Sequence, residues 1–366
     1  MKFMDEYRQP ALIQRNLAEL RQAITRRWVI MDVCGGQTHS LLRHGLEAAL
    51  EDVLELVHGP GCPVCVTPAE AIDAAAELAR RPNVIVASFG DMLRVPGQRG
   101  SLLQARAEGA KIRIVYSPMD AVELAASQPD QQVVFFGVGF ETTVPATALA
   151  LLHARQRGLT NFSLLVSHVR VEPAMRAVMQ SAETRVQGFL AAGHVCTVTG
   201  YENYHSFVAE FSVPVVVTGF EPLDLINGLF ECVQSLEQGQ PRLSNQYERS
   251  VSPTGNLHAQ RLMEQVYEIV DTPWRGFGRI AGGGLAIRPE FCEFDARVRF
   301  QLADAVCSSD VDCRSKEVML GVIKPPECPL FGNQCTPETP VGAPMVSSEG
   351  ACSAYYRYSR SNELTS

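Results

Sequence analysis

The sequence predicts an α/β protein with two similar Rossmann-like domains, each built on a parallel sheet, and a cleft between them. A cysteine-rich C-terminal domain follows. Short β-branched apolar runs alternate with Ala- and Leu-rich stretches, as in a parallel sheet covered by helices. This alternation occurs twice along the 366 residues, and after about residue 240 it gives way to a segment rich in proline and cysteine.

The first domain is predicted over residues 1–128. An amphipathic helix of about Ala11 to Arg26 opens it, and we place this helix against the C-terminal domain. Four strand runs follow, with the sequences WVIMDV, VLELV, VIVAS and IRIVYS. Stretches between them, such as AEAIDAAAELAR, have the periodicity of helices. The loops CGGQTH and GPGCPVC each follow a strand.

The second domain is predicted over residues 129–240. Its boundary with the first domain falls in the polar stretch SQPDQQ. Its strand runs are VVFFGV, FSLLVS, GFLAA and VPVVVT, and the loops GFETT and GFEPLD follow two of them. In open α/β sheets, ligands bind at the carboxyl ends of the strands. We expect the carboxyl edges of the two sheets to face each other and to form a ligand-binding cleft between the domains.

The third domain is predicted over residues 241–366. A helix of about Leu257 to Val270 and a glycine-rich turn, RGFGRIAGGG, precede a tail with few apolar runs. Such a tail buries too little apolar surface to fold alone, so a metal ion or cluster is expected to organise it. Four thiolates can bind a [4Fe–4S] cluster or a structural zinc ion, and the spacing favours neither. The thiols available are Cys307 or Cys313, Cys328, Cys335 and Cys352.

Composition excludes several classes of protein. The net charge is −8, and Lys and Arg form no cluster longer than a pair, which argues against nucleic acid as a partner. No run approaches the roughly 20 apolar residues that span a bilayer. The charged N-terminus, MKFMDEYRQP, is not a signal peptide. We therefore expect a cytoplasmic protein without a membrane partner, in which the thiols are kept reduced.

Cys62 and Cys65 form the one C-x-x-C pair. A thiolate at the start of a helix is stabilised by free backbone N–H groups, which makes it acidic and reactive. The pair is interpreted as a redox pair with one accessible thiol, or as half of a zinc site. Cys34 ends the first strand, and is either a small buried residue or a third member of a thiol cluster with His39 nearby.

Polar residues follow other predicted strands. Asp91 stands in FGDMLRVPG, and Glu141 and Thr142 stand in GFETT. They either cap helices or contact a ligand, or a charged metal fragment, in the cleft. Three histidines also follow strands and are interpreted as structural, hydrogen-bonding residues: His58, His168 and His194.

Taken together, the motifs are more specific than any one of them. CGGQTH, HGPGCPVC, FGDMLRVPG, FFGVGFETT, GFEPLD and the ending CPLFGNQC…GAPMVSSEGAC have an order and spacing that closely resembles the HypD family. Members of this family are maturation factors for [NiFe] hydrogenases. The likeness covers nearly the whole chain. One departure is Gln37, where some members carry histidine in the first motif, so an obligatory metal ligand at this position is doubtful.

The resemblance implies a site and a set of partners. Such proteins, with a small HypC-type chaperone, hold iron while cyanide and carbon monoxide ligands are added. Cyanide comes from HypE, which makes it with HypF, and the finished Fe(CN)2CO unit passes to the hydrogenase large-subunit precursor. By motif, Cys34 is the ligand of the assembly iron, and Cys62 and Cys65 cycle between dithiol and disulfide. A [4Fe–4S] cluster, the expected source or relay of electrons, is then held by Cys313, Cys328, Cys335 and Cys352.

Two other functions compete with this assembly scaffold. One is a stand-alone thiol–disulfide oxidoreductase that receives electrons from a cluster. The other is a binding protein stabilised by zinc. In the scaffold, His39, Asp91, Glu141 and Thr142 are expected to contact the iron unit. Stable complex formation with a small chaperone would favour the scaffold, and turnover of protein disulfides without a chaperone would favour the oxidoreductase.

Overall fold

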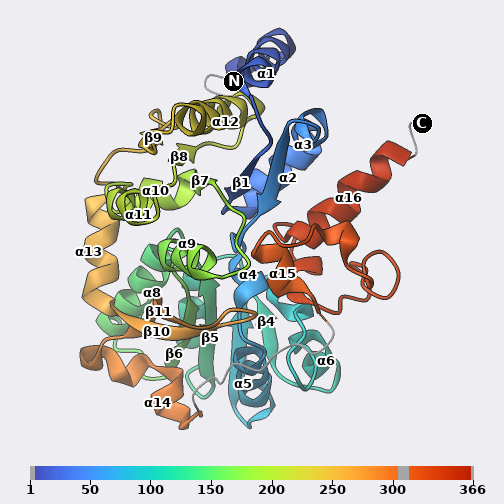
Figure 1. The fold of residues 1–366 in the computed structure, drawn as a ribbon. Helices are drawn as coiled ribbons and strands as arrows, with labels where there is room; N and C mark the ends of the chain where they lie inside the picture. Colours follow the sequence, from blue (N-terminus) through green and yellow to red (C-terminus); the bar gives the residue numbers. More distant parts are fainter. Residues whose placement is uncertain (1–4, 304–312, 364–366) are drawn as a thin grey trace.

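Two parallel sheets form the centre of the computed structural model, which describes residues 5–303 and 313–363 (Figure 1). Sheet A has the strand order β2-β1-β7-β8-β9, and sheet B has the order β4-β3-β5-β6. Sheet A comprises β1 (Trp28–Asp32), β2 (Leu54–His58), β7 (Gly188–Ala192), β8 (Val215–Thr218) and β9 (Leu243–Asn245). Sheet B comprises β3 (Val84–Ser88), β4 (Ile112–Ile114), β5 (Gln132–Gly139) and β6 (Phe162–His168). All the strand pairs within both sheets are parallel.

Helices connect and cover these strands. Up to β8 they are η1 (Asp5–Arg8), α1 (Pro10–Ala23), α2 (Gly35–Arg43), α3 (Leu46–Leu50), α4 (Pro63–Val66), α5 (Ala69–Arg80), η2 (Gly90–Arg94), α6 (Leu102–Ala107), α7 (Pro118–Ser127), α8 (Val144–Gln156), α9 (Val171–Gln180), α10 (Gly193–Thr199) and α11 (Tyr204–Phe211). The later elements are α12 (Pro222–Glu237), α13 (Leu257–Val266), the antiparallel hairpin β10 (Tyr267–Trp274) and β11 (Gly278–Ile287), η3 (Pro289–Phe294), α14 (Ala296–Phe300), α15 (Ser315–Met319), η4 (Pro325–Glu327), η5 (Ala343–Met345) and α16 (Ala351–Glu363).

All eight predicted strands form, and both sheets are parallel, as the sequence predicts. The predicted division of the strands at residue 128 is wrong, however. β1 and β2 pair with β7, β8 and β9, whereas β3 and β4 pair with β5 and β6. The chain therefore crosses from sheet A to sheet B after β2 and returns after α9. An apolar run identifies a strand but not its neighbour, because pairing depends on tertiary packing.

The opening helix also differs from its predicted position. α1 packs against α12 rather than against the C-terminal segment, and Figure 1 shows these two helices together, far from α16. Leu20 of α1 is fully buried, and Asn16 donates a hydrogen bond of 2.9 Å to the side-chain oxygen of Asn227 in α12. The apolar face of α1 thus covers the outer side of sheet A.

The region after residue 240 adds a strand to sheet A and a separate two-stranded sheet beside sheet B. β9 extends sheet A, and the hairpin β10–β11 lies beside the edge strand β6, with a bridge between Val169 and Gly284. The predicted helix ends at Val266, and β10 begins at the next residue. Seven of the ten residues of the predicted glycine-rich turn belong to β11, and the turn itself is residues 275–277. Gly276 in the turn and Gly278 at the start of β11 have φ of 84° and 78°.

One apolar core runs continuously between the two sheets. Met31 and Phe189 of sheet A belong to the same buried cluster as Phe136 of sheet B and Met319 of the C-terminal segment. Separate clusters lie on the outer face of each sheet. Because the central core joins both sheets to the C-terminal segment, the carboxyl ends of the strands are held in fixed relation to one another.

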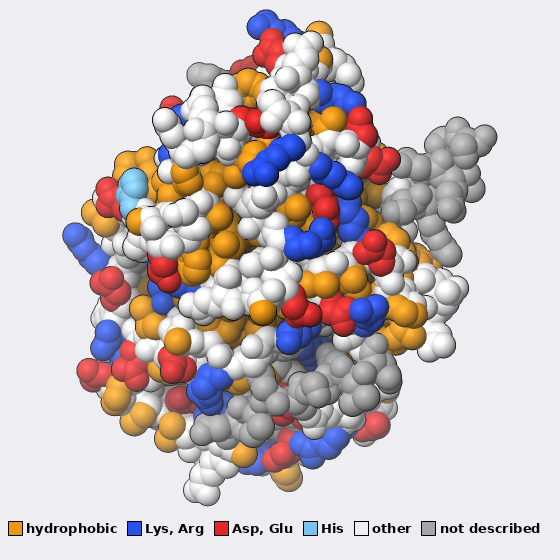
Figure 2. All heavy atoms as spheres, in the orientation of Figure 1, with side chains coloured by type: hydrophobic (Ala, Val, Ile, Leu, Met, Phe, Trp, Pro, Cys, Tyr) orange, Lys and Arg blue, Asp and Glu red, His pale blue; other side chains and the backbone are white. Residues whose placement is uncertain are grey.

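The molecular surface is mixed in charge. Figure 2 shows Lys and Arg side chains interspersed with Asp and Glu over the face in view. Within the part of the chain that the structure describes, no helix is both long and apolar enough to cross a membrane.

Candidate functional site

A cavity of about 480 Å³ lies where the carboxyl ends of the two sheets face each other, as the sequence predicts. Its walls come from loops after β1, β2 and β7 of sheet A, from loops after β3 and β5 of sheet B, and from the C-terminal segment. Its polar side chains belong to Cys34, Asp91, Thr142, Thr143, His194, Thr197, Ser347, Ser348 and Glu349. We call this cavity the cleft.

Close backbone contact between two loops positions Cys34. The chain leaves β1 in extended conformation at Cys34, which precedes α2. The N–H of Gly35 donates to the carbonyl of Gly61, at 3.1 Å, so the first cysteine loop is joined to the second. A Cβ atom on Gly61 would lie 2.4 Å from the Cys34 nitrogen, so only glycine allows the loops to touch.

Burial keeps the Cys34 thiol protonated. Burial and, to a smaller extent, the carboxylate of Glu349 together raise the pKa of this thiol to about 12. The backbone N–H groups of Gly36 and Gln37 act in the opposite direction. A cation that binds Cys34 must therefore displace a proton, as thiolate metal ligands generally require.

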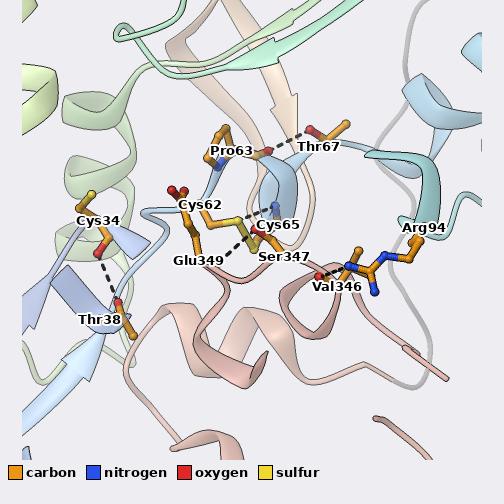
Figure 3. The surroundings of a disulfide bond; sticks show 10 residues. All are labelled: Cys34, Thr38, Cys62, Pro63, Cys65, Thr67, Arg94, Val346, Ser347 and Glu349. Carbon is orange, nitrogen blue, oxygen red and sulfur yellow. Dashed lines mark hydrogen bonds between the residues drawn. A yellow bond between two sulfur atoms is a disulfide. The ribbon is translucent and has the colours of Figure 1, made fainter. Parts of the chain in front are cut away.

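Cys62 and Cys65 form a disulfide at the start of α4 (Figure 3). The Cys65 N–H points at the sulfur of Cys62, at 3.3 Å. The predicted accessible thiol is not found in this oxidised form, because the two residues are only 4% and 2% exposed. In the view of Figure 3, the carboxylate of Glu349 lies between Cys34 and the disulfide.

Two acidic side chains line the cleft. Asp91 lies in η2 after β3, and Glu349 lies in the C-terminal segment. Burial raises the pKa of Glu349, and the charge of Asp91 adds to this effect. The cleft therefore disfavours a second negative charge, and a bound cation would favour the ionised form of Glu349.

The end of β2 is held by a buried ionic network. His58 contacts the Asp32 carboxylate through Nδ1, and its Nε2 lies 3.2 Å from Glu47. Burial lowers the pKa of His58, but Asp32 and Glu47 outweigh it and raise the pKa to about 10. Lys324 and Tyr355 of the C-terminal segment both contact Glu47. His58 is thus structural, as the sequence analysis expects.

The four predicted cluster cysteines line one pocket in the C-terminal segment. Its remaining walls are largely apolar and include Val318, Leu330, Phe331, Val341 and Met345. Burial, followed by the charges of the other three thiols, raises the pKa of Cys352 well above its usual range. We call this space, lined by Cys313, Cys328, Cys335 and Cys352, the four-cysteine pocket.

The donor set of this pocket suits a soft metal centre, since thiolates are the ligands of zinc and of iron–sulfur clusters. Within residues 5–303 and 313–363, no group of three or more His, Cys, Asp or Glu side chains is drawn together closely enough to hold a single metal ion. The four cysteines line a shared pocket instead. Cys307, the alternative to Cys313, lies outside the described residues.

Comparison with known proteins agrees with the motifs. The HypD family model, described as "Hydrogenase formation hypA family", matches residues 11–359. This chain belongs to the HypD family. It is 45% identical to the "Hydrogenase maturation factor HypD" of Escherichia coli (strain K12), with 98% of each chain covered. The proteins of that name from Azotobacter vinelandii and Cupriavidus necator are 43% and 40% identical, and at least 98% of each chain is covered.

The HypD motifs do not all contribute to the cleft. Cys34, Asp91 and Thr142 line it. His39 does not, and its Nε2 lies 2.9 Å from the hydroxyl of Tyr358 in α16. Glu141 is buried behind the cleft wall, where its carboxylate accepts the N–H of Val171.

Gln37, the departure from some HypD members, faces the interior of sheet A. It is fully buried, and its amide donates to the carbonyl of Ala191, at 3.0 Å, and to the hydroxyl of Thr218, at 2.6 Å. This side chain therefore ties α2 to the ends of β7 and β8. It does not line the cleft, so a glutamine is compatible with the site.

Sequence reasoning missed the histidine of the cleft and one of its two carboxylates, besides several hydroxyl side chains. His194 was interpreted as structural, yet it lines the cleft and stacks on Phe220, with ring centroids 3.8 Å apart. Glu349 follows no strand, and its only signal is its place in the quoted ending motif.

Glu141 provides a test of the electrostatics behind the cleft wall. Burial raises the pKa of Glu141 to about 7, although Arg170 and the N–H of Val171 favour the ionised form. Between pH 4.5 and 7 the unfolded chain therefore binds fewer protons than the folded one, and this residue's contribution to stability falls as the pH rises. The free energy of unfolding of the wild type, relative to Glu141→Gln, should fall by up to about 3 kcal/mol between pH 4 and pH 8.

Urea unfolding at both pH values measures this difference. Glu183→Gln is the matched control, because Glu183 is exposed and its replacement should change stability equally at the two pH values. An unchanged difference for Glu141→Gln would show that the Glu141 carboxyl is solvated.

Proposed function

We propose that this chain is a scaffold on which the iron unit of a [NiFe] hydrogenase is assembled. Together with a HypC-type chaperone, it holds iron while cyanide and carbon monoxide ligands are added. HypE, supplied by HypF, is the proposed cyanide donor, and the hydrogenase large-subunit precursor is the proposed recipient. Membership of the HypD family supports this role. The observation that carries it is the Cys34 thiol, which opens into a cleft between two sheets beside Asp91 and Glu349.

The cleft is suited to an iron(II) unit as its substrate. The Cys34 sulfur would bind the iron after losing its proton, and the nearby carboxylates offset the positive charge of the metal. Cyanide ligands accept hydrogen bonds through nitrogen, and the hydroxyls of Thr142, Ser347 and Ser348 line the same space. The cavity of about 480 Å³ has room for an iron ion with several small ligands.

Cys62 and Cys65 are the proposed redox pair. Conversion of their disulfide to the dithiol takes two electrons and two protons, and it requires no protein substrate. Both residues are almost fully buried, so a macromolecular thiol cannot reach them without an opening of the structure. This burial favours the scaffold over a stand-alone oxidoreductase.

A [4Fe–4S] cluster is the proposed occupant of the four-cysteine pocket. Cys313, Cys328, Cys335 and Cys352 would hold it, and the apolar walls would shield it from water. When bound, such a cluster supplies electron transfer at a potential set by its surroundings.

Replacement of Cys34 tests the iron site. Anaerobic Cys34→Ala protein, co-produced with the other maturation proteins, should lose the infrared bands of cyanide and carbon monoxide, because its cleft offers no other thiol as a ligand among the lining residues described. Its iron–sulfur content should stay that of the wild type. The matched control is Cys292→Ala, since Cys292 is exposed and lies outside the cleft. Bands of wild-type intensity in Cys34→Ala would place the iron elsewhere.

Replacement of Cys335 tests the cluster. Cys335→Ala should lose its visible absorption and its acid-labile sulfide, and residues 313–358 should become sensitive to protease, because the metal supplies much of the folding energy of such segments. Cys292→Ala serves again as the control. A Cys335→Ala protein with full sulfide content and a resistant tail would remove this residue from the ligand set.

A further inference from the structure

A single short segment joins the two candidate sites. Residues Gly342–Cys352, which we call the connecting segment, line the four-cysteine pocket at both ends, through Gly342 and Cys352. Its middle lines the cleft, through Ser347, Ser348 and Glu349. One continuous stretch of backbone therefore contributes to both cavities.

The connecting segment folds back on itself tightly. Met345 N–H donates to the carbonyl of Gly342 at 3.1 Å, and Gly350 N–H donates to that of Ser347 at 3.0 Å. The two ends touch, because a Cβ atom on Gly350 would lie 2.2 Å from the Pro344 carbonyl oxygen. A displacement at either end must therefore move Glu349.

Both ends of the segment are next to cluster cysteines. Gly342 packs so closely on Cys313 that a Cβ atom would lie 2.2 Å from its sulfur. Cys352 at the other end is itself a proposed ligand. A metal centre bonded to Cys313 and Cys352 would clamp the two ends of the loop together, which reduces its conformational freedom.

Two contacts hold the middle of the segment over the cleft. Arg94, at the end of η2, donates from its guanidinium to the carbonyl of Val346 at 3.1 Å (Figure 3). Glu349 packs against the Cys34 loop, since a Cβ atom on Gly35 would lie 2.2 Å from the Glu349 carbonyl oxygen. The position of Glu349 beside Cys34 thus depends on the loop that carries it.

We propose that occupation of the four-cysteine pocket fixes the connecting segment and thereby places Glu349 beside Cys34, so that the iron site is complete only in the cluster-loaded protein. Arg94 is a positioning residue in this device. The proposal rests on the proposed function for its two metal sites. It adds that the iron site in the cleft depends on occupation of the four-cysteine pocket. An apo protein would then not present a finished iron site.

Cysteine alkylation of the full chain tests this linkage without any iron in the cleft. The chain is purified anaerobically with the Cys62–Cys65 disulfide intact, and one half is treated with a chelator. Alkylation rates are then read peptide by peptide by mass spectrometry. Cys34 should react at least about fivefold faster in the chelated protein, the change that about 1 kcal/mol of lost ordering produces. Equal rates would overturn the proposal.

Two other thiols of the same chain are internal controls. Cys292 is exposed and should react equally in both samples, while Cys196 is fully buried and should stay unreactive unless the whole fold opens. A parallel rise at Cys196 would mean global unfolding and would also overturn the proposal.

A variant separates the effect of the Arg94 hydrogen bond from that of the cluster ligands. Arg94→Ala removes the hydrogen bond to Val346 and leaves all four cysteines, so the loaded variant should keep its iron and sulfide but alkylate faster at Cys34. Arg113→Ala, an exposed position on β4, is the matched control and should behave as the wild type. Wild-type Cys34 rates in Arg94→Ala would remove Arg94 from the device.

Iron and sulfide analysis of the same samples distinguishes failure of the linkage from failure of the cluster assignment. Equal Cys34 rates in protein that carries a cluster reject the linkage alone, whereas protein without iron and sulfide rejects the cluster and the linkage together.

Discussion

The pairing of His58 with Asp32 and Glu47 is the interaction on which the rest of the site depends. Asp32 ends β1 and His58 ends β2, so their contact fixes the two strands just before the two cysteine loops begin. All three side chains are buried, and buried charges are tolerated only when they are paired and hydrogen-bonded. Removal of the histidine would take from Asp32 its cationic partner and leave Glu47 with Lys324 alone. Such a change is costlier than the loss of one surface ion pair.

The same network reaches the other parts of the site. Thr38 of α2 donates to Asp32 at 2.6 Å, which holds the helix that follows Cys34. Lys324 and Tyr355 bring the C-terminal segment to Glu47, so the four-cysteine pocket is attached to the same point of sheet A. The cleft is therefore built on a rigid base. Its thiol and carboxylates come from loops that are individually short and have few alternatives for their position.

The sequence predicts the fold class and the strands well, because β-branched runs such as VIVAS and VPVVVT have one dominant use in an α/β protein. It places Cys34 near Cys62 correctly, since neighbouring parallel strands end at the same edge. It does not predict that β7 lies beside β1, because strand pairing is decided by packing between distant segments. Nor does it single out Glu349, which reaches the cleft only through the fold of the connecting segment.

The central claim is that His58 is a buried cation between two carboxylates. Nitrogen-15 NMR of the full chain with labelled histidine measures its protonation directly, and the spectrum of His58→Gln assigns the signal among the eight histidines. The account predicts that both ring nitrogens of His58 stay protonated up to pH of about 9, with the titration near the pKa of about 10. Because this pKa is raised on folding, the network's stabilisation is fully present below pH 6.5 and is lost as the pH rises through about 10. A His58 that titrates near pH 6.5, or that is neutral at pH 8, would contradict the account.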